Sequence, residues 1–162
     1  PYPAVIVDRH WNLVTGNGAA LGLFTEGVAP DLLEPPINVY RLGLHPEGLA
    51  PRVRNGEAYT HHLLARLHRD VLTSGDPVLA ELLDEVRSFV PAEAAAHRLT
   101  DPSEMLFLPM DFTTVEGVEL SFFSTLATFG TPLDVTVEEL SIEAFFPADE
   151  ATRQHLASRS RT

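Results

Sequence analysis

Apolar side chains recur at alternate positions along Met105–Thr128, which reads MLFLPMDFTTVEGVELSFFSTLAT. A period of two sends successive side chains to opposite faces of a β-strand. Glu116-Gly117 forms a turn that divides the stretch into two strands, and Gly130-Thr131-Pro132 ends the second. The pattern therefore predicts an antiparallel hairpin with one face toward the core.

A third strand is predicted over Glu138–Phe146, although Thr136 and Glu139 also have the spacing of a helix-capping box. The β-branched and aromatic residues before Pro147 favour the strand. On this interpretation the glutamates of the run, including Glu143, lie on the exposed face. The presumed inner face of the sheet comprises Leu106, Leu108, Met110, Phe112, Phe122, Leu126, Leu140 and Ile142.

The first half of the chain predicts a hairpin followed by helices. Ala4–Asp8 and Trp11–Thr15 are β-rich, and Asn17 would cap a short helix. Further helices are predicted at Asn38–Leu44, at Gly56–Thr73 behind Asn55, and after Asp76-Pro77. Two strands, several helices and then three strands favour an α+β fold. We expect an antiparallel sheet whose inserted helices cover one face.

Composition limits the functions open to the chain. Its 162 residues fit one domain with a single core. The net charge is −12, with 11 Arg, no Lys and 23 acidic residues, so the domain itself is not expected to grip DNA. Cysteine is absent and no apolar run approaches the ~20 residues that span a bilayer. We therefore expect a cytoplasmic protein that does not enter membranes.

Motifs for catalysis, metals and nucleotides are weak. Gly16-Asn17-Gly18 resembles a dinucleotide loop, but no second parallel strand follows it. His61, His62 and His68 lack the spacing of a metal site and are expected to face solvent. A grouping of Ser124, His45 and Asp134 has nothing to recommend it. We expect no enzyme activity, no metal and no cofactor.

Two segments, Pro35–Arg52 and Leu120–Asp149, combine many apolar side chains with a few polar ones, as a pocket for an apolar molecule requires. Arg41 and His45 lie one helical turn apart and could bind a carboxylate head group, although both could equally be structural. The residues predicted to contact ligand are Asn38, Arg41, His45, Arg52, Leu108, Met110, Phe112, Phe122, Ser124, Thr125, Leu126, Thr128, Leu140 and Ile142.

From PAVIVDRHWNLVTGN (3–17) to AFFPADEAT (144–152), the chain resembles the ligand-binding domain of MmyB-like transcription regulators. The resemblance implies a PAS-like fold over residues 1–162 and a fatty-acid-like ligand. It also implies a helix-turn-helix DNA-binding domain upstream, which agrees with a chain that begins at Pro1 without methionine. The function we expect is ligand sensing for that regulator. The alternative is a ligand-free module that forms a homodimer or docks a protein partner.

Overall fold

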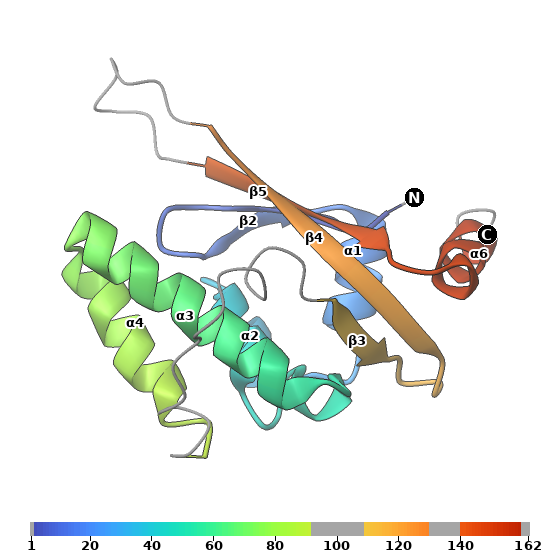
Figure 1. Ribbon diagram of the computed structural model, residues 1–162, viewed down its shortest axis with the longest axis horizontal. Coiled ribbons are helices and arrows are strands. Elements are labelled where there is room, and N and C mark those ends of the chain that lie inside the picture. The colour runs from blue at the N-terminus through green and yellow to red at the C-terminus, as the bar shows by residue number, and fades with distance from the viewer. Residues whose placement is uncertain (1, 92–108, 130–139, 160–162) are drawn as a thin grey trace.

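The computed structural model describes residues 2–91, 109–129 and 140–159. Five strands in these ranges form one antiparallel sheet in the order β2-β1-β5-β4-β3. Helices inserted between β2 and β3 cover one face of this sheet (Figure 1). The predicted α+β, PAS-like fold is confirmed. The strands are β1 (Ala4–Val7), β2 (Leu13–Gly16), β3 (Met110–Thr113), β4 (Glu119–Phe129) and β5 (Leu140–Pro147).

The inserted helices begin and end at residues suited to these positions. The side chain of Asn17 caps α1 by accepting from the Ala20 N–H (2.9 Å), and that of Asp76 caps α4. The longest helix, α3, ends at Gly75 in the left-handed region (φ 65°), which favours glycine. The helices are α1 (Gly18–Phe24), α2 (Val39–Leu44), α3 (Gly56–Ser74) and α4 (Pro77–Arg87), with short 3₁₀ turns η1 (Pro30–Leu33) and η2 (Ala50–Arg52).

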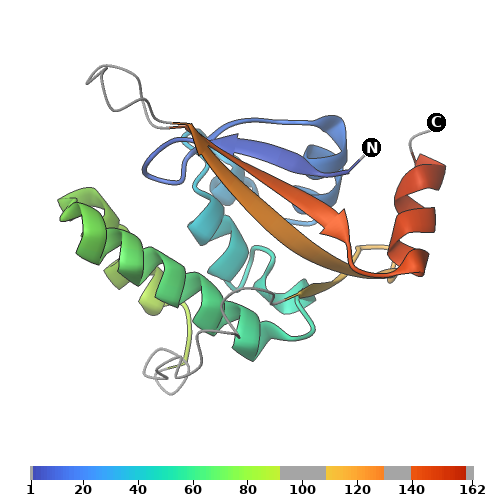
Figure 2. The same cartoon turned by 45° about the horizontal axis from the view of Figure 1, so that its top comes forward.

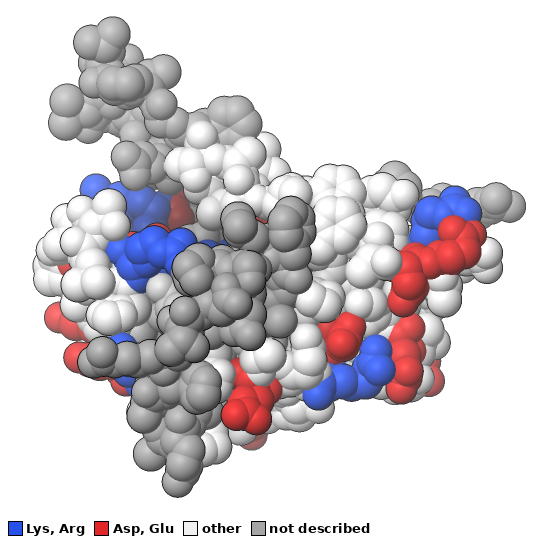
Figure 3. Space-filling view, in the orientation of Figure 1, with Lys and Arg blue, Asp and Glu red and all other residues white. Residues whose placement is uncertain are grey.

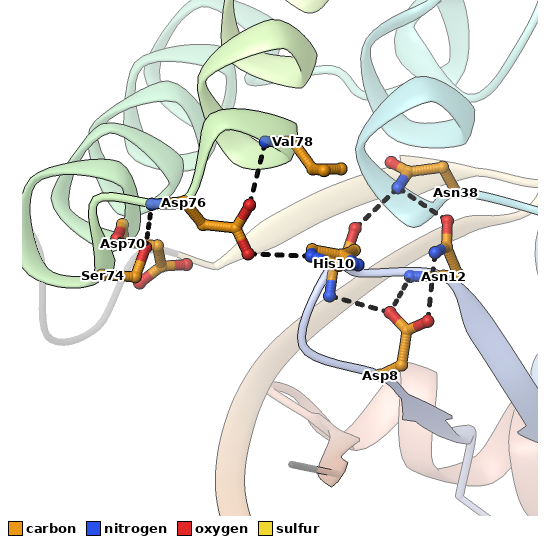
Figure 4. A network of polar contacts seen from close by, with 8 residues as sticks. All are labelled: Asp8, His10, Asn12, Asn38, Asp70, Ser74, Asp76 and Val78. Atoms are coloured by element: carbon orange, nitrogen blue, oxygen red, sulfur yellow. Dashed lines mark hydrogen bonds and ion pairs between the residues drawn. The ribbon is translucent and has the colours of Figure 1, made fainter. Parts of the chain in front are cut away.

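The turn between β1 and β2 places an aromatic side chain in the core. The Asp8 carboxylate accepts from the backbone N–H groups of His10 (2.8 Å) and Asn12 (2.9 Å), as Figure 4 shows. Trp11 between them adopts φ 65°, an uncommon conformation for a bulky residue. Trp11 is only 6% exposed, and its indole N–H donates to Asp70 on α3 (3.0 Å). The turn therefore anchors the hairpin to the helical layer.

The sheet register decides which side chains face the helices. Residues directly opposite one another in a ladder lie on the same face. In β4, the predicted phase agrees with burial, because Leu120 and Phe122 are buried. In β5, Glu143 and Phe145 are buried, so Leu140 and Ile142 lie on the other face. The prediction that Leu140 and Ile142 point inward and Glu143 outward was wrong, because a charged residue on this face is buried with a partner.

Two predictions about α3 also need correction. Asn55 occupies the N-cap position, but its side chain makes no capping bond. It instead donates to the Pro109 carbonyl (2.6 Å) and accepts from the Asp111 N–H (3.0 Å), which ties the start of α3 to β3. His61, expected to face solvent, is 7% exposed.

A helix that the sequence did not predict, α6 (Glu150–Arg159), follows β5. It lies beside the end of β4 and β5, apart from the other helices (Figure 2). Thr152 is fully buried there, and its hydroxyl accepts from the Ser121 N–H of β4 (2.9 Å). The polar contact fixes α6 against the sheet without closing the side that α1–α4 cover.

Candidate functional site

A cavity lies between the covered face of the sheet and helices α1, α2 and α3. The space open to the centre of a water molecule in this cavity has a volume of about 70 Å³. One water needs ~10–15 Å³ on this measure, so the space exceeds a packing defect. Most of its lining is apolar. Val5, Met110 and Phe145 line it from the sheet, and Phe24, Leu42 and Leu63 line it from the helices.

One wall of this cavity carries a buried ion pair. The Nη1 of Arg66 on α3 lies 3.0 Å from Oε1 of Glu143 on β5, and the two side chains are 17% and 9% exposed. Arg66 Nε also donates to the hydroxyl of Tyr40 (2.9 Å), and Ser124 Oγ donates to Glu143 Oε1 (2.9 Å). Such a satisfied network supplies fixed polar groups at one place in an otherwise apolar space.

Aromatic rings hold the Arg66 guanidinium in place. Its central carbon lies 4.5 Å from the Trp11 ring centroid and 5.6 Å from that of Tyr40. The two rings meet edge to face at 5.2 Å. Trp11 does not line the cavity, but it helps to position the guanidinium that forms its polar wall.

Burial determines the charge states around this wall. Burial raises the pKa of Tyr40 and of Tyr59 above the usual range, so both phenols stay neutral. Burial is the largest single influence on Arg66 and lowers its pKa, but the charges and hydrogen bonds of Glu143 and Tyr40 together outweigh burial, so the pKa is raised. Burial also raises the pKa of Asp70. The site thus contains the Arg66 cation, which stays protonated, beside the neutral hydroxyl groups of Tyr40 and Tyr59.

A smaller hollow of about 10 Å³ adjoins the ion pair. Ser124, Phe122 and His62 line it together with Arg66 and Glu143. Burial and the nearby Arg66 lower the pKa of His62, which favours a neutral imidazole. The hollow has room for about one water molecule.

The four polar residues predicted from Pro35–Arg52 each contact another part of the fold, although the buried Nη2 of Arg52 has no hydrogen-bond partner among the described residues. Asn38 caps α2 and donates to the His10 carbonyl (2.9 Å). Arg41 forms a two-pronged ion pair with Glu85 of α4, at 2.7 Å for each bond. The His45 ring packs on Phe89 (4.7 Å between centroids), and the Arg52 guanidinium lies over Phe112 (4.9 Å). None of these four predicted residues lines either cavity.

The predicted strand residues divide between the cavity and other places. Met110 lines both hollows, and Phe122 and Ser124 line the smaller one. Phe112 is buried in the core, Leu126 is 42% exposed, and Thr128 shares a hydrogen bond with Ser141 (3.0 Å). Thr125 is exposed and faces outward with Leu140 and Ile142. Leu108 lies outside the described residues.

Sequence reasoning missed the residues that give the cavity its polar wall. Arg66 follows Tyr59 and Leu63 at three- and four-residue steps, so the helical period placed it near the buried face. Glu143 likewise alternates in phase with Phe145. Both signals were present, but Glu143 was expected to lie on the exposed face and Arg66 was not singled out. Their pairing joins positions 77 residues apart and has no local signature.

Basic side chains do not form a continuous surface on the face shown in Figure 3, where arginines lie among acids. Arg54 pairs with Glu119 (3.2 Å), and Arg153 pairs with Glu150. Within the described ranges, no cluster of three potential metal-binding His, Asp or Glu side chains occurs. No helix described there is both long and apolar enough to cross a bilayer.

An antiparallel sheet with helices over an apolar cavity defines a small-molecule-binding domain of the PAS-like class. Residues 1–158 match the family model of the MmyB-like transcription regulator ligand binding domain. The chain belongs to this family and is a ligand-binding domain of a transcription regulator. A comparison with curated proteins found no match.

Proposed function

We propose that the domain binds an elongated apolar molecule, such as a fatty acid or related acyl compound, in the cavity beneath α1, α2 and α3. The mostly apolar lining, with the Arg66–Glu143 pair on one wall, is the observation that carries this proposal. Each buried methylene contributes about 0.8 kcal/mol. A chain of several carbons therefore supplies substantial affinity without any further polar contact.

The cavity must widen to accept a long chain, since its present volume of about 70 Å³ holds only a short segment. Leu21 of α1 lines the cavity and is 40% exposed, so we infer that a ligand enters beside this helix. This helix has only seven residues and depends on the Asn17 cap. If α1 moves to widen the cavity, the ligand binds the widened conformation more tightly than the closed one. Such a difference in affinity is what allows a ligand to shift the conformation of the domain and so to signal.

The signal would pass to a DNA-binding domain elsewhere in the regulator. With a net charge of −12 and arginines paired to acids, this domain is poorly suited to contact DNA phosphates. We assign residues 1–162 to one cytoplasmic sensor domain that acts by binding and not by catalysis.

The contact of His10 with Asp76 (2.9 Å) lies outside the cavity and joins the hairpin to the start of α4, as Figure 4 shows.

Extraction and titration test the proposal. Protein purified from cells is extracted with organic solvent, and mass spectrometry of the extract should reveal an apolar compound in stoichiometric amount. Stripped protein should then bind N-phenyl-1-naphthylamine, a neutral fluorescent probe. A ligand at 100 times its dissociation constant should raise the free energy of unfolding by about 2.7 kcal/mol. Absence of both extracted compound and probe uptake would overturn the proposal.

The outer face of the sheet favours the second candidate, a ligand-free dimerisation or protein-interaction module. Phe123 and Phe146 stack there at 5.4 Å between centroids, and Phe123 is 38% exposed. Ile142 lies on the same face. Exposed apolar side chains that adjoin one another are typical of interaction surfaces. A dimer by light scattering that Phe123→Ser disrupts, together with no uptake of the probe, would favour this function over ligand sensing.

A further inference from the structure

The charge of Arg66 is already balanced inside the protein. Each of its three guanidinium nitrogens donates to a protein group: Nε to Tyr40, and Nη1 and Nη2 to the two oxygens of Glu143 (3.0 and 3.5 Å). Ser124 supports the same carboxylate. The buried pair is therefore neutral as a unit, and Arg66 needs no anionic ligand to balance its charge.

A free carboxylate would add an uncompensated negative charge to this wall. If it displaced Glu143 from Arg66, then Glu143 would stay buried on a central strand, between β1 and β4, without its cation. If it did not, the ligand itself would be the unpaired charge. Asp70, one helical turn from Arg66, adds a further acidic group nearby.

Hydroxyl groups offer the cavity a different mode of recognition. Tyr40 and Tyr59 both line it, and Tyr40 accepts a bond from Arg66 while its own hydrogen stays available. In the part of the chain that the structure describes, neither tyrosine hydroxyl donates to a protein acceptor. Neutral donors of this kind suit a carbonyl, amide or hydroxyl oxygen.

Resting on the proposed function, and narrowing it from fatty acids to their neutral acyl relatives, we propose that the ligand carries an uncharged polar head group, such as an amide, ester or alcohol, in preference to a free carboxylate. The apolar chain fills the cavity, and the head group lies at the wall formed by Arg66, Glu143 and the two tyrosines. Glu143 is then a specificity-determining residue, because it removes the positive potential that a carboxylate would otherwise meet.

Decanamide and decanoate test this inference because they have the same chain length and nearly the same shape. Their affinities are measured at pH 8 through displacement of N-phenyl-1-naphthylamine. Wild-type protein should bind decanamide at least tenfold more tightly than decanoate. In Glu143→Gln, Arg66 is left uncompensated, and the preference should move toward decanoate by at least tenfold. The matched control is Glu85→Gln, which neutralises the acid of the Arg41–Glu85 pair outside the cavity and should leave the preference unchanged.

The outcomes separate the two proposals. Equal or tighter binding of decanoate by wild-type protein would overturn the neutral head group while leaving an apolar ligand in place. An unchanged preference in folded Glu143→Gln would also overturn it. Failure of the probe and both decanoyl compounds to bind would overturn the proposed function itself. The wild-type comparison stands alone if Glu143→Gln does not fold, as judged by circular dichroism.

Discussion

The Arg66–Glu143 pair joins the longest helix to the middle of the sheet, with Nη1 and Oε1 3.0 Å apart. The two residues also line both hollows. The contact that fixes α3 over β5 is therefore the contact that gives the cavity its polar wall. If the proposed function holds, stability and ligand recognition depend on the same side chains.

Arg66→Met should lower the free energy of unfolding by about 3–5 kcal/mol, because Glu143 is left buried without a cation. The double variant Arg66→Met, Glu143→Leu removes both charges and should recover much of this loss. Arg41→Met is the control, since its pair with Glu85 is about 40% exposed and should contribute at most about 1 kcal/mol. Urea unfolding gives all three values. Equal losses in Arg66→Met and Arg41→Met would contradict the role of the buried pair.

Gly43→Ala should have opposite effects on stability and binding. Gly43 lines the cavity within α2, and an added Cβ would lie 3.5 Å from Leu63, an ordinary contact. Helix propensity should stabilise the fold by about 0.5–1 kcal/mol. The methyl group occupies ligand space, so affinity for decanamide should fall about fourfold, the equivalent of one methylene.

Gly22→Ala is the matched control for that experiment. Gly22 is exposed in α1, and an added Cβ would meet no atom within 4 Å. Thermal unfolding should show a similar gain in stability, and titration should show unchanged affinity. Equal loss of affinity in both variants would mean that the cavity beside Gly43 is not where decanamide binds.

Asp70→Asn should stabilise the protein at pH 7. Burial raises the pKa of Asp70, so the folded state holds a proton more tightly than the unfolded chain does. Stability of the wild type therefore falls as pH rises through the interval between the unfolded and folded pKa. The advantage of Asp70→Asn should shrink as pH falls through that interval and be lost below it. Urea midpoints from pH 7 to about pH 2.5 measure the trend, and an advantage that grows on acidification would refute the assignment.

Asp76→Asn should show the opposite dependence. Hydrogen bonds from the His10 ring and the Val78 N–H lower the pKa of Asp76 (Figure 4). Its contribution to stability is present above the unfolded pKa and disappears as pH falls through the depressed folded pKa. Asparagine retains the helix cap, so the variant should be less stable than wild type at pH 7 and converge with it in acid. The same urea series provides the check.

Local patterns were sufficient for most of the fold. Asn17 and Asp76 could be identified as caps because their partners are two or three residues away. Alternation placed Met110, Phe112 and Phe122 on the correct face of the sheet. The predictions failed where a polar residue binds a distant partner. Asn55 occupies the N-cap position of α3, but its side chain bonds to Pro109, 54 positions away, and does not cap the helix.

The candidate site was less accessible to sequence reasoning for the same reason. Met110 was predicted because apolar alternation is local. The Arg66–Glu143 pair was missed because burial of charge is favourable only when a complementary group arrives from elsewhere in the chain. Arg41 shows the converse, because its helical spacing suggested a head-group site, yet its partner is Glu85 of the adjacent helix.

The strand order has a consequence for how the chain reaches this state. Strand β5 separates β1 from β4, and Ala4 pairs with Ala144. Until the last strand leaves the ribosome, the sheet exists only as two disconnected ribbons, each marginal alone. Sequence-distant pairing of this kind slows folding. Assembly of the domain during translation therefore waits for its final fifth, and nascent chains cut short before β5 are natural substrates for chaperones and proteases.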